Sequence, residues 1–447
     1  MKGDKDMKFR KTAAALLAAA MCLVSACGGN TTAPADGTQA ETEQTPAVSL
    51  GEMRDMTTQE IVKDMGMGIN LGNTFEATGG SGSTVQAFET MWGSPVVTQP
   101  LIQGYADAGF GVMRLPVAWS NLMADDYTIS PELLARIDEV TGWAVDSGLY
   151  VIMNIHWDGG WWEKFPTEKE ECMKKYTRIW EQLCSYYGKY GDKLMFESLN
   201  EEGGWESIWN RYSGTAGEEK ERSYALLNEI NQKFVDIVRA SGGNNEKRHL
   251  LIAGYNTDVD LTCDELFVMP EDPAGRCAVS VHYYTPSTFC LLEKDASWGK
   301  AKKTWGHEKE VKEMEDNMDK LKTRFVDNGI PVIMGEYGCV AVRNKEPDVV
   351  RRFNLCAAQS MYTRGICPVL WDIKGLFYDR YFFTMKDEEF MNGLKRIEAG
   401  EDVMSEELAA YEKQREEARE KKAAESAAAE AAESSAAEEQ PSADNAA

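Results

Sequence analysis

Short apolar segments recur along the chain, and each is followed by polar residues or glycine. Eight of them fit strands, and they lie at residues 65–72, 111–117, 149–156, 194–201, 249–255, 278–284, 331–338 and 367–372. Segments with apolar residues at helical spacing lie between them, as at residues 131–148 and 314–329. The second of these ends at Gly329, with Pro331 just beyond it, which is a usual helix stop. Apolar strands that alternate with amphipathic helices predict a parallel sheet covered by helices.

The number of strand–helix units predicts the α/β class and a single closed (β/α)8 TIM barrel. The alternative is an open Rossmann sheet, which needs the pattern G-x-G-x-x-G after its first strand. The first apolar segment reads MGMGINLGN, so its glycines follow a different pattern, and the sequence contains no P-loop motif.

The two ends of the chain differ in composition from the middle. Residues 1–26 combine a basic stretch with an apolar run too short to span a membrane, which predicts a signal peptide. The letters VSAC resemble a bacterial lipobox, which implies cleavage before Cys27 and lipidation of its sulfur; the alternative is an ordinary signal peptide with an incidental cysteine. Residues 27–50 are rich in Gly, Thr, Ala and Pro and predict a flexible tether.

The barrel is expected over residues 51–397. Residues 398–447 form an acidic tail rich in Ala and Glu, expected to be helical to about residue 422 and disordered beyond. We therefore expect an exported lipoprotein on a bacterial cell surface, monomeric, with membrane contact only through the lipid at Cys27.

The net charge of -25 at pH 7 argues against nucleic acid and against anionic substrates, and favours a neutral ligand. Eight cysteines follow Cys27, and none lies in a C-x-x-C pair. A chain of this size does not need covalent staples, so we predict neither a disulfide nor a zinc site.

Polar and aromatic residues follow nearly every predicted strand, at the carboxyl ends where a barrel of this kind builds its site. They are Asn70, Asn73, Arg114, His156, Asp158, Asn200, Glu201, Tyr255, His282, Tyr284, Glu336, Tyr337, Trp371 and Asp372. Glu201 ends the fourth strand and Glu336 the seventh, so the two face each other across the mouth. One glutamate alone could be a structural, salt-bridged carboxylate, but two facing carboxylates are what glycoside hydrolysis requires.

Seven motifs appear in order over about residues 52–395: GINLGNTFEA, MRLPVAW, VIMNIHWDG, FESLNE, VHYYTP, IMGEYG and LWD. Together they resemble glycoside hydrolase family 5, a retaining family of clan A. The sequence is most similar to its subfamily 4, the endo-β-1,4-glucanases that include cellulases, lichenases and xyloglucanases. The resemblance implies a hydrolase without a cofactor or metal that acts on a β-glucan polysaccharide or oligosaccharide.

The resemblance also implies roles for single residues. Glu201 matches the general acid and base, Glu336 the nucleophile, and Arg114 the arginine that lowers the pKa of the nucleophile. The family residues that surround the sugar at the cleavage point correspond to His156, Asn200, His282 and Tyr284. Tryptophans can stack on the apolar faces of sugars, and the expected substrate-binding residues are Asn73, Trp92, Trp157 and Trp371. Other candidates for stacking are Trp161, Trp162 and Trp205, whereas Trp180, Trp209, His249 and His307 are expected to be structural or on the surface.

The sequence departs from the family pattern at three places. Glu202 replaces the usual proline after the Asn-Glu pair, and we expect its side chain to be solvated. Trp157 replaces a second histidine, and Ile373-Lys374 replaces Asn-Gly. The last two changes affect positions where sugars bind, so they bear on substrate preference rather than on the reaction.

Three alternatives stay open beside a retaining endo-hydrolase of β-1,4-linked glucans. The same barrel could be a β-mannanase or another β-glycosidase. It could also be a glycan-binding surface lipoprotein without catalysis, a class that would predict replacement of one catalytic glutamate. A metal barrel would use His156, Asp158 and His282.

Overall fold

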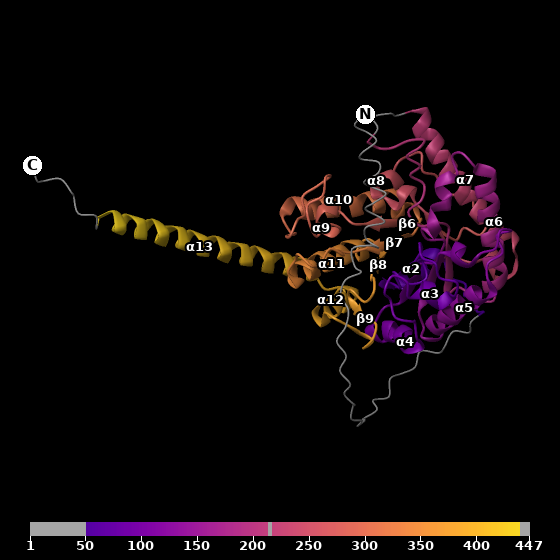
Figure 1. The fold of residues 1–447 in the computed structure, drawn as a ribbon, viewed down its shortest axis with the longest axis horizontal. Helices are drawn as coiled ribbons and strands as arrows, with labels where there is room; N and C mark the ends of the chain where they lie inside the picture. Colours follow the sequence, from indigo (N-terminus) through magenta and orange to yellow (C-terminus); the bar gives the residue numbers. More distant parts are fainter. Residues whose placement is uncertain (1–50, 213–216, 439–447) are drawn as a thin grey trace, which may run out of the picture.

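The computed structural model describes residues 51–212 and 217–438, so the predicted signal peptide, the tether and Cys27 lie outside the described residues. Eight parallel strands close into a barrel in the order of the chain (Figure 1). They are β1 Gly68–Asn70, β2 Val112–Leu115, β3 Tyr150–Asn154, β4 Leu194–Glu197, β5 Leu250–Ala253, β6 Cys277–Tyr283, β7 Val332–Tyr337 and β8 Ile366–Leu370. Each strand falls in one of the eight predicted segments, and the predicted TIM barrel is confirmed.

Helices surround the barrel. They are α2 Thr58–Asp64, α3 Val85–Glu89, α4 Gln99–Ala108, α5 Pro131–Asp146, α6 Lys169–Tyr187, α7 Glu218–Ala240, α8 Val259–Thr262, α9 Ser287–Cys290, α10 Glu308–Arg324, α11 Pro347–Tyr362, α12 Glu388–Glu398 and α13 Val403–Glu438. Short 3-10 turns lie at η1 Trp119–Leu122, η2 Asp158–Lys164, η3 Gly243–Glu246, η4 Tyr255–Thr257 and η5 Val326–Asn328. A separate antiparallel hairpin follows β8 and pairs β9 Tyr378–Asp379 with β10 Thr384–Met385.

Both helices predicted in detail are present, as α5 and α10. Gly329 ends the second segment with a left-handed backbone (φ 77°), which glycine adopts without steric cost. Among the described residues, none of the helices is both long and apolar enough to cross a membrane.

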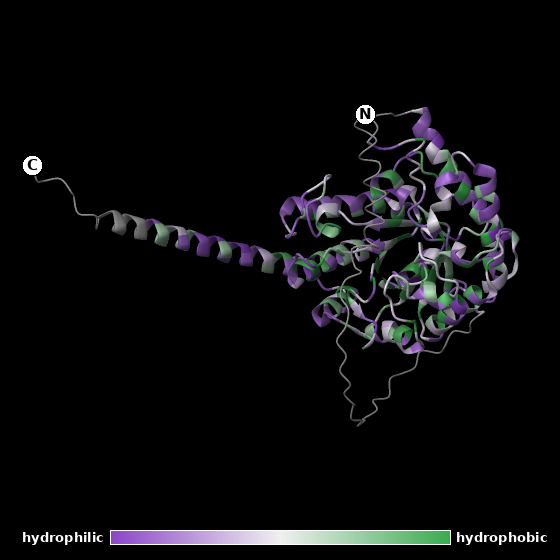
Figure 2. Cartoon of the chain, in the orientation of Figure 1, coloured by the Kyte–Doolittle hydropathy of each residue, from purple (hydrophilic) through white to green (hydrophobic). Residues whose placement is uncertain are grey.

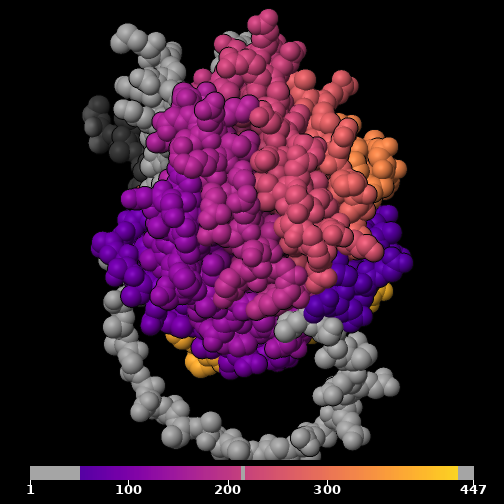
Figure 3. Space-filling model, turned by 90° about the vertical axis from the view of Figure 1, so that its right-hand side faces the viewer, coloured from indigo at the N-terminus to yellow at the C-terminus, as the bar shows by residue number. Residues whose placement is uncertain are grey.

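Buried apolar side chains form two layers. The inner layer fills the barrel with residues such as Ile152, Met195 and Ile333, and α2 adds Ile61 and Met65 to it. The outer layer packs the strands against the surrounding helices, and its apolar residues, green in Figure 2, lie on both kinds of element. Figure 3 views the wall around α6 and α7, where segments from the middle of the chain form one closely packed surface. This rigid frame fixes the carboxyl ends of the strands.

The acidic tail is helical for longer than the sequence analysis predicts. Helix α13 continues to Glu438 rather than ending near residue 422, and it extends away from the barrel as a single rod (Figure 1). Its many Ala, Glu and Lys residues have high helix propensity, which accounts for the added length.

The packed domain also extends past its predicted boundary at residue 397. The first turns of α13 lie on α11, and Val403 (2% exposed) and Tyr411 (7% exposed) are buried. The guanidinium of the buried Arg352 lies 4.0 Å from the centre of the Tyr411 ring. The beginning of the tail is therefore part of the core packing, because apolar residues near its start cover α11.

We expect a chain that ends at Ile397 to be less stable than the full chain by about 3 kcal/mol. The reason is the lost burial of Val403 and Tyr411 together with the Arg352–Tyr411 contact. A chain that ends at Lys422 keeps all three and serves as the control, expected to lie within about 0.5 kcal/mol of the full chain. Urea unfolding measures the difference, and equal stability of the two shortened chains would contradict this boundary.

Candidate active site

Arg114 is the centre of the hydrogen-bond network at the carboxyl ends of the strands. It lies on β2 and is completely buried. Its Nε donates to Glu197 Oε2 at 2.8 Å, and its Nη1 donates to Glu336 Oε1 at 2.8 Å and to Asn70 Oδ1 at 3.2 Å. Its Nη2 donates to Asn200 Oδ1 at 2.8 Å. One buried cation therefore links strands β1, β2, β4 and β7.

Glu336 lies near the end of β7 and is nearly buried, with 6% of its side chain exposed. The Tyr284 hydroxyl donates to Glu336 Oε2 at 2.8 Å, so both oxygens of this carboxylate have a donor. Burial raises the pKa of Glu336 above its ordinary value, and the charge of Arg114 is among the interactions that oppose the rise. The expected lowering by Arg114 is thus present, but the net direction is upward because desolvation is the larger effect.

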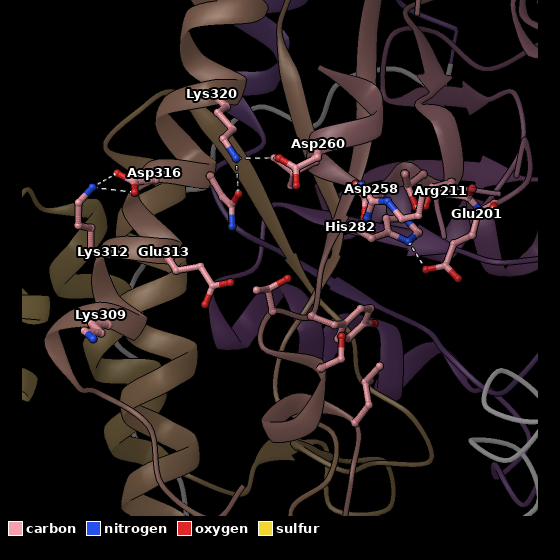
Figure 4. Close-up of a pocket in the computed structure, with 18 residues that line it drawn as sticks. Glu201, Arg211, Asp258, Asp260, His282, Lys309, Lys312, Glu313, Asp316 and Lys320 are labelled. Carbon is pink, nitrogen blue, oxygen red and sulfur yellow. Dashed lines mark hydrogen bonds and ion pairs between the residues drawn. The ribbon is translucent and has the colours of Figure 1, made fainter. Parts of the chain in front are cut away.

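Glu201 faces Glu336 but has a different environment. Its side chain is 47% exposed, and its Oε1 lies 2.8 Å from His282 Nδ1 (Figure 4). It lines a cleft, where the surrounding protein displaces part of its bulk hydration although water still reaches the carboxyl. This desolvation raises the pKa of Glu201 to about 7.

His282 lies between the two carboxylates, and its register partner on β7 is Glu336. Its Nδ1 is 2.8 Å from Glu201 Oε1 and 3.7 Å from Glu336 Oε2. Burial lowers the pKa of His282 to about 4, so the imidazole is neutral at pH 7 and carries one N–H.

One ligand atom each of Glu201, His282 and Glu336 lies within 4.8 Å of the other two. This spacing fits the separation of about 5–5.5 Å between carboxyl groups in retaining glycosidases better than the about 6.5–9.5 Å of inverting ones. The same three residues could hold a metal ion. The oxygens of Glu336 are already engaged by Arg114 and Tyr284, however, which suits a carboxylate held ready for chemistry on a substrate.

Glu202 is buried, with 1% of the residue exposed, so the expectation of a solvated side chain is wrong. Its carboxyl oxygen accepts the backbone N–H of Asn200 and thereby shapes the turn that presents Glu201. Burial raises the pKa of Glu202 well above its ordinary value. The Glu202 side chain does not point into water, because it folds back and accepts a hydrogen bond from this backbone N–H.

Glu197 is a buried residue of the site that the sequence analysis overlooked. It accepts Arg114 Nε at 2.8 Å on one oxygen and the Ser280 hydroxyl at 2.7 Å on the other. A signal for it exists in the sequence, since an arginine inside an apolar strand needs a buried counter-charge. Glu197 is a charged residue inside the apolar fourth strand.

The predicted sugar-binding residues differ in their surroundings. The rings of His156 and Trp371 are nearly parallel, with an interplanar angle of 8° and centroids 5.9 Å apart. Asn73 has a left-handed backbone (φ 55°), and its Nδ2 is a buried atom without a hydrogen-bond partner among the described residues. Trp157 is 37% exposed, and Trp92 is partly exposed.

The other tryptophan candidates are less available. Trp205 is 3% exposed and Trp162 9%, so neither is free to stack on a sugar, because both pack within the outer core layer. Trp161 is partly exposed and donates its indole N–H to Asp158 at 2.7 Å. Trp180 and Trp209 are buried in the core, as predicted.

Several polar residues at strand ends serve the structure. Tyr255 bonds to Ser223, and Asp158 accepts the Ser120 hydroxyl. Asp372 forms a buried ion pair with Arg380. His249 is buried and bonds to Thr58 at 2.9 Å, which agrees with its expected structural role, whereas His307 is the N-cap of α10.

A cleft of about 590 Å³ extends from Glu201 and His282 toward α10 (Figure 4). Arg211, Asn256 and Asp258 form one wall, and charged residues of α10, including Lys309 and Lys312, form the far end. Polar and charged residues therefore dominate the cleft that begins at Glu201.

Comparison with known proteins agrees with this geometry. The model of the family "Cellulase (glycosyl hydrolase family 5)" matches residues 75–376. Endoglucanase B of Clostridium cellulovorans is 33% identical over 325 residues, which cover 72% of this chain and 69% of that protein. The xyloglucan-specific endo-beta-1,4-glucanase of Bacteroides ovatus is 35% identical over 300 residues, covering 64% of this chain and 57% of that protein.

Among solved structures, a GH5-4 broad specificity endoglucanase from an uncultured bovine rumen ciliate is similar, with a TM-score of 0.70 and 33% identity. The match covers 78% of this chain and 99% of that chain.

We expect Glu197→Gln to lower the pKa of both Glu201 and Glu336. Glu197 offsets the charge of Arg114, and without it the uncompensated guanidinium favours the ionised form of both carboxyls. Carbon NMR of the labelled glutamate carboxyls should show Glu201 titrating near pH 7 in the native chain, and both carboxyls titrating at lower pH in the variant.

Ser280→Ala is the matched control, because it removes the other hydrogen bond of Glu197 and keeps the charge. Equal titration shifts in the two variants would show that packing, rather than the charge of Glu197, sets these pKa values.

Proposed function

Since the chain belongs to the cellulase family, glycosyl hydrolase family 5, and is a hydrolase that cleaves β-1,4-linked glucans internally, we propose that Glu336 is its nucleophile and Glu201 its general acid and base. The observation that carries this assignment is the contrast between the two carboxyls. Glu336 is buried and accepts from Arg114 and Tyr284, which favours an ionised carboxylate. Glu201 is open to the cleft and has a pKa of about 7, which suits a group that gives and takes a proton.

In the first step, protonated Glu201 gives its proton to the glycosidic oxygen while Glu336 attacks the anomeric carbon. The C–O bond to the leaving sugar breaks, and a covalent glycosyl–enzyme ester forms. The transition state resembles an oxocarbenium ion, and the negative charge of Glu336 stabilises it. The burial of Tyr284 raises its pKa well above the ordinary value, so it stays a hydroxyl donor to Glu336 throughout.

In the second step, ionised Glu201 takes a proton from water, and the resulting nucleophile attacks the same carbon. Glu336 leaves, and the product has the configuration of the substrate. Neutral His282 can donate its N–H to the ionised form of Glu201 and accept from the protonated form, depending on which nitrogen holds the proton. It therefore fits both protonation states of the acid and base.

Asn200 is placed to bind the sugar at the cleavage point. Its Oδ1 accepts from Arg114, which leaves its amide N–H groups to donate to a sugar hydroxyl. Hydrogen bonds of this kind to the 2-hydroxyl strengthen in the transition state. His156, Asn73, Trp92, Trp157 and Trp371 complete the proposed sugar-binding side.

The proposed substrates are cellulose chains, mixed-linkage glucan and xyloglucan. Support comes from relatives described as an endoglucanase, a xyloglucan-specific endo-β-1,4-glucanase and a broad specificity endoglucanase. The cleft extends from Glu201 and His282 as far as α10, which leaves room for a polymer beyond the cleavage point.

The test of these roles is sugar release from carboxymethylcellulose, barley mixed-linkage glucan, xyloglucan and glucomannan. We expect release from at least one of the first three, and a loss of at least about 10³-fold in both Glu201→Ala and Glu336→Ala. Azide should then rescue both variants on an activated aryl glycoside. Glu201→Ala should give a glycosyl azide of retained configuration, and Glu336→Ala one of inverted configuration.

The reverse pattern of configurations would exchange the two roles. Release from glucomannan alone would favour the β-mannanase alternative, and silence of the folded native chain on all four glucans would favour a binding protein.

We further propose that the chain is an exported lipoprotein, held as a monomer on the bacterial cell surface through Cys27. The support is the sequence VSAC after an apolar run, followed by a tether-like segment before the barrel. More than one acyl chain is needed for stable membrane attachment, and bacterial lipoproteins carry more than one. Attachment would keep released oligosaccharides close to the cell.

Metabolic labelling with a radioactive fatty acid should mark the native chain in the membrane fraction. Cys27→Ala should lose the label and leave the membrane fraction, because the acylated sulfur is gone. Cys172→Ala is the control, since this thiol is buried in the barrel domain and should not affect labelling. Labelling that survives Cys27→Ala would reject the proposed anchor.

A further inference from the structure

Two neighbouring aromatic side chains stand out on the surface. Phe382 is 79% exposed and Tyr381 71%, the highest values among the exposed large hydrophobic residues. They lie in the turn of the β9–β10 hairpin, beyond residues 75–376 that the family model matches. Single exposed apolar residues are common on proteins, but two adjacent rings this exposed forgo a substantial burial energy.

The turn that carries the two rings is held in one conformation. Asp379 Oδ1 accepts the backbone N–H of Tyr381 at 2.9 Å and that of Phe382 at 3.0 Å. The N–H of Phe383 donates to the Asp379 carbonyl at 2.8 Å, and Phe383 has a left-handed backbone (φ 58°). The rings are thus presented on an ordered backbone, which reduces the entropy lost when a ligand binds.

The hairpin is also fixed to the barrel. Tyr378 is completely buried, and its ring centre lies 4.6 Å from that of Tyr105 on α4, beside which Figure 1 places β9. A Cβ on Gly104 would meet the Tyr378 hydroxyl at 2.0 Å, so this close approach needs glycine. Tyr378 and Arg380 on the N-terminal side of the exposed pair are therefore buried, and Phe383 on the other side is partly buried.

Arg380 joins the hairpin to the sugar-binding edge of the cleft. This buried side chain bonds to the Asp372 carboxylate at 3.1 Å, to Thr74 Oγ1 at 2.9 Å and to Ser94 Oγ at 3.1 Å. Asp372 follows Trp371, Thr74 follows Asn73, and the Ser94 hydroxyl donates to the Asn73 carbonyl at 2.6 Å. The hairpin and the proposed sugar-binding residues therefore belong to one hydrogen-bonded unit.

We propose that Tyr381 and Phe382 form a second glucan-binding site, which holds the polymeric β-glucan outside the catalytic cleft. The inference rests on the proposed function, because a polymer with apolar sugar faces is then the ligand that meets this surface. Two adjacent rings suit such faces, and Tyr381 adds a hydroxyl that can bond to sugar hydroxyls. Because Tyr381 and Phe382 are fixed to the same rim of the barrel as Trp371, they would keep a long glucan near the cleft. They would contribute little to the binding of a short oligosaccharide.

The test compares Tyr381→Ala/Phe382→Ala with the native full chain in native gels that contain soluble mixed-linkage glucan or xyloglucan. Both chains carry Glu336→Ala, so that the polymer is not digested during the run. We expect the double variant to bind the polymer about tenfold more weakly, which corresponds to about 1.4 kcal/mol for the two stacking rings together. Trp298→Ala is the matched control, because it removes a ring that is 43% exposed elsewhere, and it should bind like the native chain.

Activity separates this proposal from the proposed function. With Glu336 present, the double variant should cleave cellotetraose at the native rate and polymer at low concentration more slowly. Native activity with unchanged polymer retention in the double variant overturns the second site alone. Absence of native activity on every glucan overturns the proposed function instead. Dimers of the native chain in sedimentation that dissociate in the double variant would assign the rings to a second copy of the chain and overturn the glucan site.

Discussion

The buried guanidinium of Arg114 is the constraint on which the rest of the site depends. A fully buried cation is costly unless every donor finds an acceptor, and here the acceptors come from Asn70, Glu197, Asn200 and Glu336. Those residues sit on strands far apart in the sequence, so the barrel must close in its observed register to satisfy them. The charge that holds the proposed nucleophile Glu336 thus also selects the geometry of the mouth, so that stability and the proposed function depend on the same interaction.

The two carboxyls of the reaction differ because the fold gives them different surroundings. Glu336 lies within β7 and accepts hydrogen bonds from Arg114 and Tyr284. Glu201 lies four residues beyond the end of β4, and its carboxyl is within hydrogen-bond distance of the neutral imidazole of His282. Burial raises both pKa values, so desolvation alone cannot assign the roles. The direct donors make the difference, because they stabilise the charged form of one carboxyl and leave the other able to exchange its proton with water in the cleft.

The sequence predicted the barrel and the facing glutamates because both follow from local pattern. Apolar runs mark the strands, polar residues mark their ends, and the resemblance to glycoside hydrolase family 5 is confirmed by the family match. The errors concern side chains whose surroundings are set by tertiary contacts. Glu202 folds back onto the Asn200 amide, Glu197 pairs with a residue on another strand, and Trp205 turns into the core. The domain boundary moved for the same reason, because Tyr411 gains its burial only from α11 and the Arg352 side chain.

An enzyme that cuts a polymer internally must leave both directions of the chain open, and this limits how far the site can be closed to water. The two carboxyls differ in their exposure to water. Glu336 accepts from Tyr284 and is 6% exposed, while Glu201 is 47% exposed. Exclusion of water from Glu336 strengthens its interactions with Arg114, and water admitted at Glu201 would supply the second step of the proposed mechanism. In the proposed binding mode, the rings of His156 and Trp371 offer faces for stacking, and the polar cleft beyond Glu201 offers hydrogen bonds to the glucan. The proposed second site on the β9–β10 hairpin would add affinity for a long polymer from a surface outside this cleft.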